Sequence, residues 1–129
     1  MSSGKSVTEL WSSLFNFRVL LRKDGKYGVY VAHCVETGSV VTAETEEDAK
    51  TMMRELLEDE ISFALRHGNL KNLFSSPAPM AVLLQWMEAA RDKAPTTVEL
   101  DINVNELEHS EIETKRAHFK NNVGFALAA

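Results

Sequence analysis

The chain has 129 residues, 44% of them apolar and 26% charged, a composition typical of one globular domain. Its formal charge of −5 at pH 7 argues against non-specific nucleic-acid binding, which requires clustered Lys and Arg. The single cysteine excludes an internal disulfide framework. No apolar run approaches the ~20 residues of a membrane span, and no apolar signal region follows the first residues. We therefore expect a cytoplasmic protein.

The first predicted elements are an N-terminal extension and a β-hairpin. Apolar residues at helical spacing make the extension, residues 1–15, compatible with a short helix. Alternation in Phe17–Arg22 predicts a strand. Asp24-Gly25 then predicts a tight turn, because both residue types tolerate positive φ, and Tyr27–Cys34 predicts the return strand.

Both faces of this predicted sheet carry apolar residues. Phe17, Val19 and Leu21 share one face of the first strand. We assign four residues to the second face: Leu20, Tyr30, Ala32 and Cys34. That face must be covered, either by a helix of the same chain or by another subunit.

A third strand is predicted at Ser39–Ala43, followed by a long amphipathic helix. Thr45 with three acidic residues behind it is typical of a helix N-terminus, and Gly68 stands where a C-terminal cap is expected. The apolar positions between them form one stripe. They are Ala49, Met52, Met53, Leu56, Leu57, Ile61, Ala64 and Leu65.

After Pro77 and Pro79 a second helix is predicted to run to about Asp92. Its apolar residues cover most of its circumference, which predicts burial on more than one side. Alternation then predicts a fourth strand at Val98–Val104, and residues 105–129 are interpreted as a polar C-terminal tail whose apolar end is left unplaced. The order β-β-β-α-α-β predicts an α+β fold, one sheet with helices packed on it.

Residues that commonly carry catalysis do not stand in catalytic patterns. His33 and Cys34 are neighbours on a predicted strand, so their side chains point to opposite faces and cannot act as a pair. His109 and His118 are nine residues apart and do not have the spacing of a metal site. We therefore expect no enzymatic activity, no metal and no cofactor.

The segment Glu44–Glu60 carries eight acidic residues and only two basic ones. Two interpretations stay open. The segment is either a solvated helix face or an acidic surface for a basic partner, whose complementary charge would mainly raise the association rate. For the second interpretation, the candidate protein-binding residues are Glu55, Glu58 and Asp59.

One stretch resembles the HicB-like antitoxin family. It comprises Tyr30-Val31-Ala32 and then Gly38-Ser-Val-Val-Thr-Ala-Glu-Thr-Glu-Glu-Asp-Ala49. Family members read aromatic-Val-Ala, a short loop, Gly-Cys-x-Thr-x-Gly-Asp-Thr-x-Glu-Glu-Ala, and a long amphipathic helix. The matching residues are Gly38, Thr45, Glu47 and Ala49, and the resemblance covers roughly residues 16–68. Val35-Glu36-Thr37 replaces the usual Pro-x-Leu-Pro loop, and Ser39 stands where Cys is common.

The resemblance implies a partial RNase H-like fold over residues 16–104, with a three-stranded antiparallel meander, a crossover helix and a fourth strand beside the first. It also implies a non-catalytic domain that binds and neutralises HicA, a small basic ribonuclease toxin. The alternative is a stand-alone HicB-like regulatory or RNA-associated module without a toxin partner.

Two further expectations concern partners. Many relatives bind DNA through a C-terminal helix-turn-helix or ribbon-helix-helix, but the 25 residues after Val104 are too few for a helix-turn-helix, so DNA binding is not expected. We expect a dimer or larger homo-oligomer, because the second helix and the second sheet face together offer more apolar surface than one small domain can bury.

Overall fold

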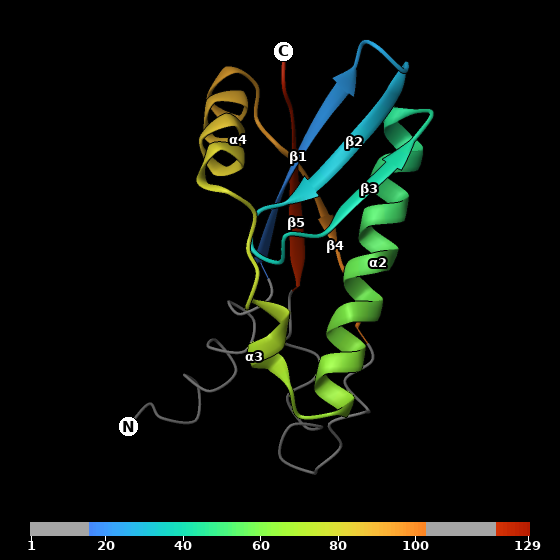
Figure 1. Cartoon of the computed structure of the whole chain (residues 1–129), viewed down its shortest axis with the longest axis vertical. Helices are drawn as coiled ribbons and strands as arrows, with labels where there is room; N and C mark the ends of the chain where they lie inside the picture. Colours follow the sequence, from blue (N-terminus) through green and yellow to red (C-terminus); the bar gives the residue numbers. More distant parts are fainter. Residues whose placement is uncertain (1–15, 103–120) are drawn as a thin grey trace.

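A computed structural model describes residues 16–102 and 121–129, which form an α+β fold with a five-stranded mixed sheet (Figure 1). The strand order is β3-β2-β1-β5-β4. The strands are β1 (Asn16–Asp24), β2 (Val29–Cys34), β3 (Val40–Ala43), β4 (Thr96–Glu99) and β5 (Asn122–Leu127), and the helices are α2 (Glu46–Arg66), α3 (Leu70–Leu73) and α4 (Met80–Asp92). The short helix considered within residues 1–15, together with His109 and His118, lies outside the described residues.

A four-residue turn joins β1 to β2, longer than the tight Asp24-Gly25 turn predicted from the sequence. Asp24 still belongs to β1 and pairs with Val29. Its side chain accepts a hydrogen bond from the Lys26 amide at 3.0 Å, and its carbonyl accepts one from the Gly28 amide at 2.8 Å. The positive φ of 68° falls on Gly28, where a glycine adopts it without steric cost. The return strand therefore begins at Val29 rather than Tyr27.

The register of β1 and β2 corrects the predicted assignment of faces. Val19 lies opposite Cys34 and Leu21 lies opposite Ala32. Because opposed residues of an antiparallel pair share a face, Ala32 and Cys34 join Val19 in the core. Placing Tyr30, Ala32 and Cys34 on the second face was therefore wrong. The buried residues of that second face are Leu20, Val31 and Ala126.

Helix α2 has the two ends that the sequence predicts. The Thr45 hydroxyl accepts a hydrogen bond from the Asp48 amide at 3.0 Å, which satisfies one free donor of the first turn. At the other end Gly68 has a φ of 61°, and its amide donates to Leu65 while the Asn69 amide donates to Ala64. This pair of bonds is a Schellman motif, so Gly68 ends the helix.

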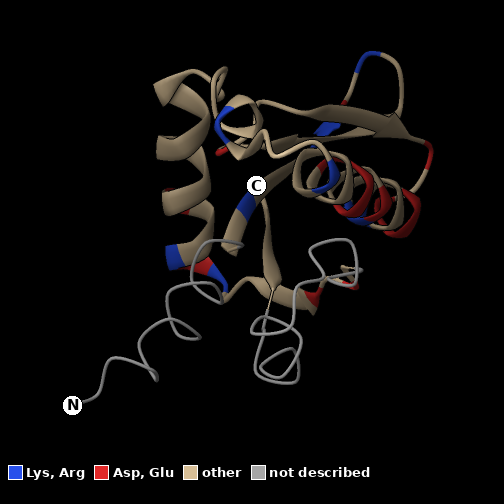
Figure 2. Cartoon of the chain, turned by 90° about the horizontal axis from the view of Figure 1, so that it is seen from below, with Lys and Arg blue, Asp and Glu red and all other residues tan. Residues whose placement is uncertain are grey.

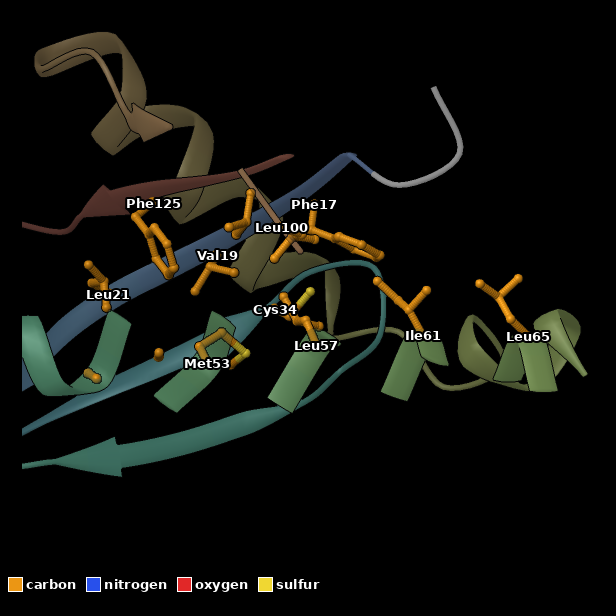
Figure 3. Packing of buried hydrophobic residues seen from close by; sticks show 13 residues of the cluster. Phe17, Val19, Leu21, Cys34, Met53, Leu57, Ile61, Leu65, Leu100 and Phe125 are labelled. Atoms are coloured by element: carbon orange, nitrogen blue, oxygen red, sulfur yellow. The ribbon is translucent and has the colours of Figure 1, made fainter. Parts of the chain in front are cut away.

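The main core lies between α2 and one face of the sheet (Figure 3). Met53, Leu57 and Ile61 point from successive turns of α2 toward the strands and are fully buried. The cluster comprises Phe17, Val19, Leu21, Ala32, Cys34, Ala49, Met53, Leu57, Ile61, Leu65, Leu100, Val123 and Phe125. Met52 belongs to the predicted stripe but is 43% exposed, so the buried stripe is narrower than expected.

Helix α4 packs on the second face of the sheet, over β1 and β5, and thus on the opposite side from α2 (Figures 1 and 2). Trp86 donates a hydrogen bond from Nε1 to the Gly124 carbonyl at 3.1 Å. Within α4, all of whose residues are described, Ala89 alone is buried. The expectation that this helix is buried on more than one side was wrong, because Met80, Leu84 and Met87 are 65%, 57% and 51% exposed.

The sheet is completed by a strand that the sequence interpretation left unplaced. β5 comes from the apolar C-terminal end and runs parallel to β1, with Leu20 opposite Ala126. Of the predicted fourth strand at Val98–Val104, the first two residues belong to β4, residues 100–102 are not in a strand, and residues 103 and 104 lie outside the described part of the chain. β4 lies at the sheet edge, antiparallel to β5 and not beside β1. Residues 122–127 are consequently part of the domain rather than of a tail.

Candidate protein-binding site

The acidic residues of the Glu44–Glu60 segment differ in what their carboxylates contact. Glu46 and Glu47 lie 3.6 and 3.0 Å from the Lys50 ammonium. Within the described residues, four of the eight have no side-chain hydrogen bond or ion pair. They are Glu44, Asp48, Glu55 and Asp59. Figure 2 shows most of the acidic positions gathered along α2.

The structure brings together two of the three predicted protein-binding residues and separates the third. Glu55 and Asp59 are exposed and one helical turn apart, so they share one side of α2. Glu58 projects to a different side, is half-buried, and accepts a hydrogen bond from the Asp101 amide at 2.7 Å. Glu58 therefore links α2 to the segment after β4 and contributes less to a free acidic surface.

Two apolar side chains extend the surface that Glu55 and Asp59 begin. Met52 and Phe63 lie three residues before Glu55 and four after Asp59, and they are 43% and 56% exposed. Positions 52, 55, 59 and 63 fall on one side of a helix with 3.6 residues per turn. We call these four residues the α2 ridge. The sequence interpretation missed Phe63, although its position outside the buried stripe was the available signal.

A pocket of about 470 Å³ opens at the C-terminal end of the α2 ridge. Helix α2, the turn between β2 and β3, and α3 form its walls. The Ser39 hydroxyl donates to the Glu60 carboxylate at 2.8 and 3.1 Å, which holds this acid at the pocket wall. Asp59 and Phe63 line the pocket as well, so the pocket and the ridge are continuous.

Gly38 shapes the turn that forms one wall of the pocket. Its φ is 78°, and a Cβ at this position would collide with the backbone carbonyl of Ser76. The Gly38 amide donates to the Cys34 carbonyl at 3.0 Å, which closes the turn. Both the positive φ and the close approach therefore require glycine.

His33 and Cys34 occupy opposite faces of β2, as the sequence predicts. Burial raises the pKa of the Cys34 thiol to about 11, so the thiolate is scarce at neutral pH. Partial burial, with a smaller contribution from the positive charge of Arg22, lowers the pKa of His33 below 6.5. His67 caps α2, and its ring centroid lies 4.1 Å from that of Phe63.

The described part of the chain offers neither a cluster of metal ligands nor a helix suited to span a membrane. Among residues 16–102 and 121–129, no three His, Cys, Asp or Glu side chains are placed to hold a metal ion. In the same residues, no helix combines the length and apolar character needed to cross a bilayer.

Comparisons with family models, with curated proteins and with solved structures found no match. The resemblance to the HicB-like family therefore rests on the sequence pattern of Tyr30–Ala32 and Gly38–Ala49.

Proposed function

We propose that this chain is a non-catalytic, HicB-like antitoxin-type domain that binds and neutralises a small basic ribonuclease toxin of the HicA type. The observation that carries the proposal is the α2 ridge. It offers two carboxylates without a hydrogen bond or ion pair in the described part of the chain, Glu55 and Asp59, between two exposed apolar side chains, Met52 and Phe63. A helix face with apolar contacts and negative charge suits a basic protein surface.

The charge of the ridge favours a protein over a nucleic acid as its partner. Phosphate groups would be repelled by Glu55 and Asp59, whereas a ribonuclease must carry cationic groups to hold its own substrate. An acidic surface that docks on those cationic groups would block RNA from reaching them. Neutralisation then requires binding alone and no chemistry by this chain.

The residues that carry the family resemblance have identifiable structural roles, which supports the proposal. Gly38 forms the tight turn between β2 and β3, and Thr45 caps α2. Ala49 is fully buried where the first turns of α2 meet the sheet. A parallel strand lies beside β1, the position the resemblance implies for a fourth strand, although β5 supplies it.

We also propose that the protein forms a homodimer through α4. The second sheet face no longer requires a partner, since α4 covers it within the chain. The exposed residues Met80, Leu84 and Met87 have the 4-3 spacing of helix-helix contacts, and no charged residue stands between Lys71 and Glu88. A second copy of this negatively charged protein would meet the least charge repulsion on this stripe.

The experiment that tests the proposed function starts from the reading frame adjacent to this gene. A basic frame of roughly 60–80 residues, the size of a compact toxin domain, should encode a protein that co-purifies with this chain and loses ribonuclease activity in the complex. If the neighbouring product is not basic, or binds without loss of its activity, the stand-alone regulatory module becomes the better account. Direct binding of RNA by the isolated chain would favour that alternative as well.

A further inference from the structure

We propose that the pocket at the end of the α2 ridge receives an arginine side chain of the basic partner. The inference rests on the proposed function and assigns a specific role to one part of the surface. The pocket volume of about 470 Å³ lies within the range of ligand pockets. Its walls come from three elements, and the turn between β2 and β3 is separated in sequence from the lining residues of α2 and α3, so the cavity is a feature of the folded chain and not of one acidic helix.

A directional chain of hydrogen bonds ends on the Glu60 carboxylate. The Ser39 amide donates to the Thr37 hydroxyl oxygen at 3.2 Å, and Thr37 and Ser39 hydroxyl oxygens are 2.8 Å apart. Since the single Ser39 hydroxyl proton is directed to Glu60, the Thr37 hydroxyl must donate to Ser39. Both hydroxyl protons are thereby used inside the pocket wall and are not offered to a ligand.

The side of the pocket formed by Ser39, Asp59 and Glu60 therefore presents acceptors. An ionised carboxylate has about four acceptor positions, and the described residues supply Glu60 with one hydroxyl donor. Asp59 adds a second negative charge and has no side-chain hydrogen bond or ion pair among the described residues. A ligand that suits this arrangement is a cation with several N–H donors, and a guanidinium supplies five in a planar fork.

The remaining walls suit the stem of an arginine. Phe63 and Leu73 contribute apolar surface, and the Phe63 ring is exposed enough for a cation to stack on it. Asn72 completes the far wall from α3. Apolar walls with carboxylates at one side match a side chain that has a hydrocarbon stem and a charged head.

The test uses the whole chain and two small probes, N-acetyl-arginine amide and N-acetyl-citrulline amide. Citrulline has nearly the shape of arginine but is uncharged. In two-dimensional NMR titrations we expect the arginine probe to shift the amide signals of Ser39, Glu60 and Phe63 with a dissociation constant in the millimolar range. Binding of the citrulline probe should be at least about ten-fold weaker, because the charge-assisted hydrogen bonds are lost.

Two variants locate the interaction. Glu60→Gln keeps the shape of the side chain and removes its charge, so arginine affinity should fall by about ten-fold. Glu55→Gln removes the same charge outside the pocket wall and should leave affinity within two-fold, an estimate based on weak coupling of exposed charges. If Glu60→Gln disturbs signals outside the pocket, Asp59→Asn, whose side chain holds no other described group in place, replaces it and should also weaken binding.

Equal binding of both probes, or shifts that map to another surface, would overturn the pocket assignment. Failure of the assignment is distinguishable from failure of the proposed function. In the first case the basic partner still binds, and charge reversal at Glu55 weakens that binding, while the arginine probe binds no better than the citrulline probe. In the second case the arginine probe binds as expected, but the neighbouring basic protein does not.

Discussion

The two faces of the sheet differ in how the chain covers them. On one face, α2 is capped at both ends and buries six residues, among them Met53, Leu57 and Ile61. On the other face, α4 begins at Pro79, which has no side-chain group to cap a helix, and it buries Ala89 alone. The more apolar helix is therefore the less buried one. The comparison teaches that the apolar content of a helix does not by itself decide how much of the helix is buried, because α4 contacts the sheet along one side and leaves Met80, Leu84 and Met87 exposed.

The contacts that hold each helix differ as well. α2 is held by a continuous apolar cluster that reaches three neighbouring strands, β2, β1 and β5. α4 is held partly by polar contacts of Trp86, which donates to the Gly124 carbonyl and lies with its ring centroid 5.9 Å from the Arg18 guanidinium. Arg18 in turn lies 2.6 Å from the Glu36 carboxylate. We infer that α2 supplies most of the stability and that α4 presents a surface.

The largest expected effect is on stability. Leu57→Ala should lower the free energy of unfolding by about 2–5 kcal/mol, because Leu57 is fully buried in the α2 core. Leu84→Ala is the matched change on α4 and should cost less than about 0.5 kcal/mol per monomer, since Leu84 is 57% exposed. Urea denaturation at a fixed low protein concentration measures both. Equal losses of unfolding free energy in the two variants would contradict the inference that α2 supplies most of the stability.

The next effect concerns association through α4. Leu84→Glu places a charge in the middle of the exposed stripe, so the dissociation constant of the proposed dimer should rise by at least about ten-fold. Sedimentation equilibrium measures the change. Met52→Glu is the control, because it places the same charge on an exposed apolar residue of α2, outside the α4 stripe. A wild-type chain that sediments as a 14.4 kDa monomer at micromolar concentrations would refute the dimer.

A smaller effect is expected at the N-terminus of α2. Thr45→Ala removes the hydroxyl that accepts from the Asp48 amide, and it should cost about 1 kcal/mol of stability. Thr45→Ser keeps the acceptor and should recover most of the loss. Chemical denaturation of the two variants checks the prediction, which fails if alanine and serine behave alike.

The smallest expected effect is a pH dependence of stability caused by His33, which lies with Leu20 on the second face of the sheet. Because the pKa of His33 is lowered in the folded state, the unfolded chain binds its proton first as pH falls below about 6.5. The stability contribution of neutral His33 is therefore present above this pH and is lost below it. His33→Gln should flatten the stability profile between about pH 7 and pH 5, a window set by the ordinary pKa of histidine. An unchanged profile would contradict the prediction that protonation of His33 lowers the free energy of unfolding.

Sequence reasoning succeeded where the signals are local. The limits of α2 follow from Thr45 and Gly68, each of which acts within one turn of its own position. β5 was missed because its pairing with β1 joins segments about 100 residues apart, and a short apolar run carries no sign of its partner. The sheet faces were misassigned because the position of Tyr30 was judged without its cross-strand neighbour Lys23.

The candidate site shows the same division. Glu55 and Asp59 could be identified as one acidic surface from helical spacing alone. The contact of Glu58 with the Asp101 amide could not be predicted from the sequence, because it depends on how the segment after β4 returns to α2. The pocket beside Glu60 also required the fold, since three separate segments meet there.

The central claim is that the α2 ridge binds a basic protein, and the association rate tests it most directly. The double reversal Glu55→Lys and Asp59→Lys should slow association with the proposed basic partner by about ten-fold or more at low salt and flatten the salt dependence of the rate. Glu88→Lys with Asp92→Lys makes the same charge change, at the same spacing, on the opposite helix, and should slow association far less. Equal rates for the two double variants would contradict the claim, because only the overall charge of the protein would then matter.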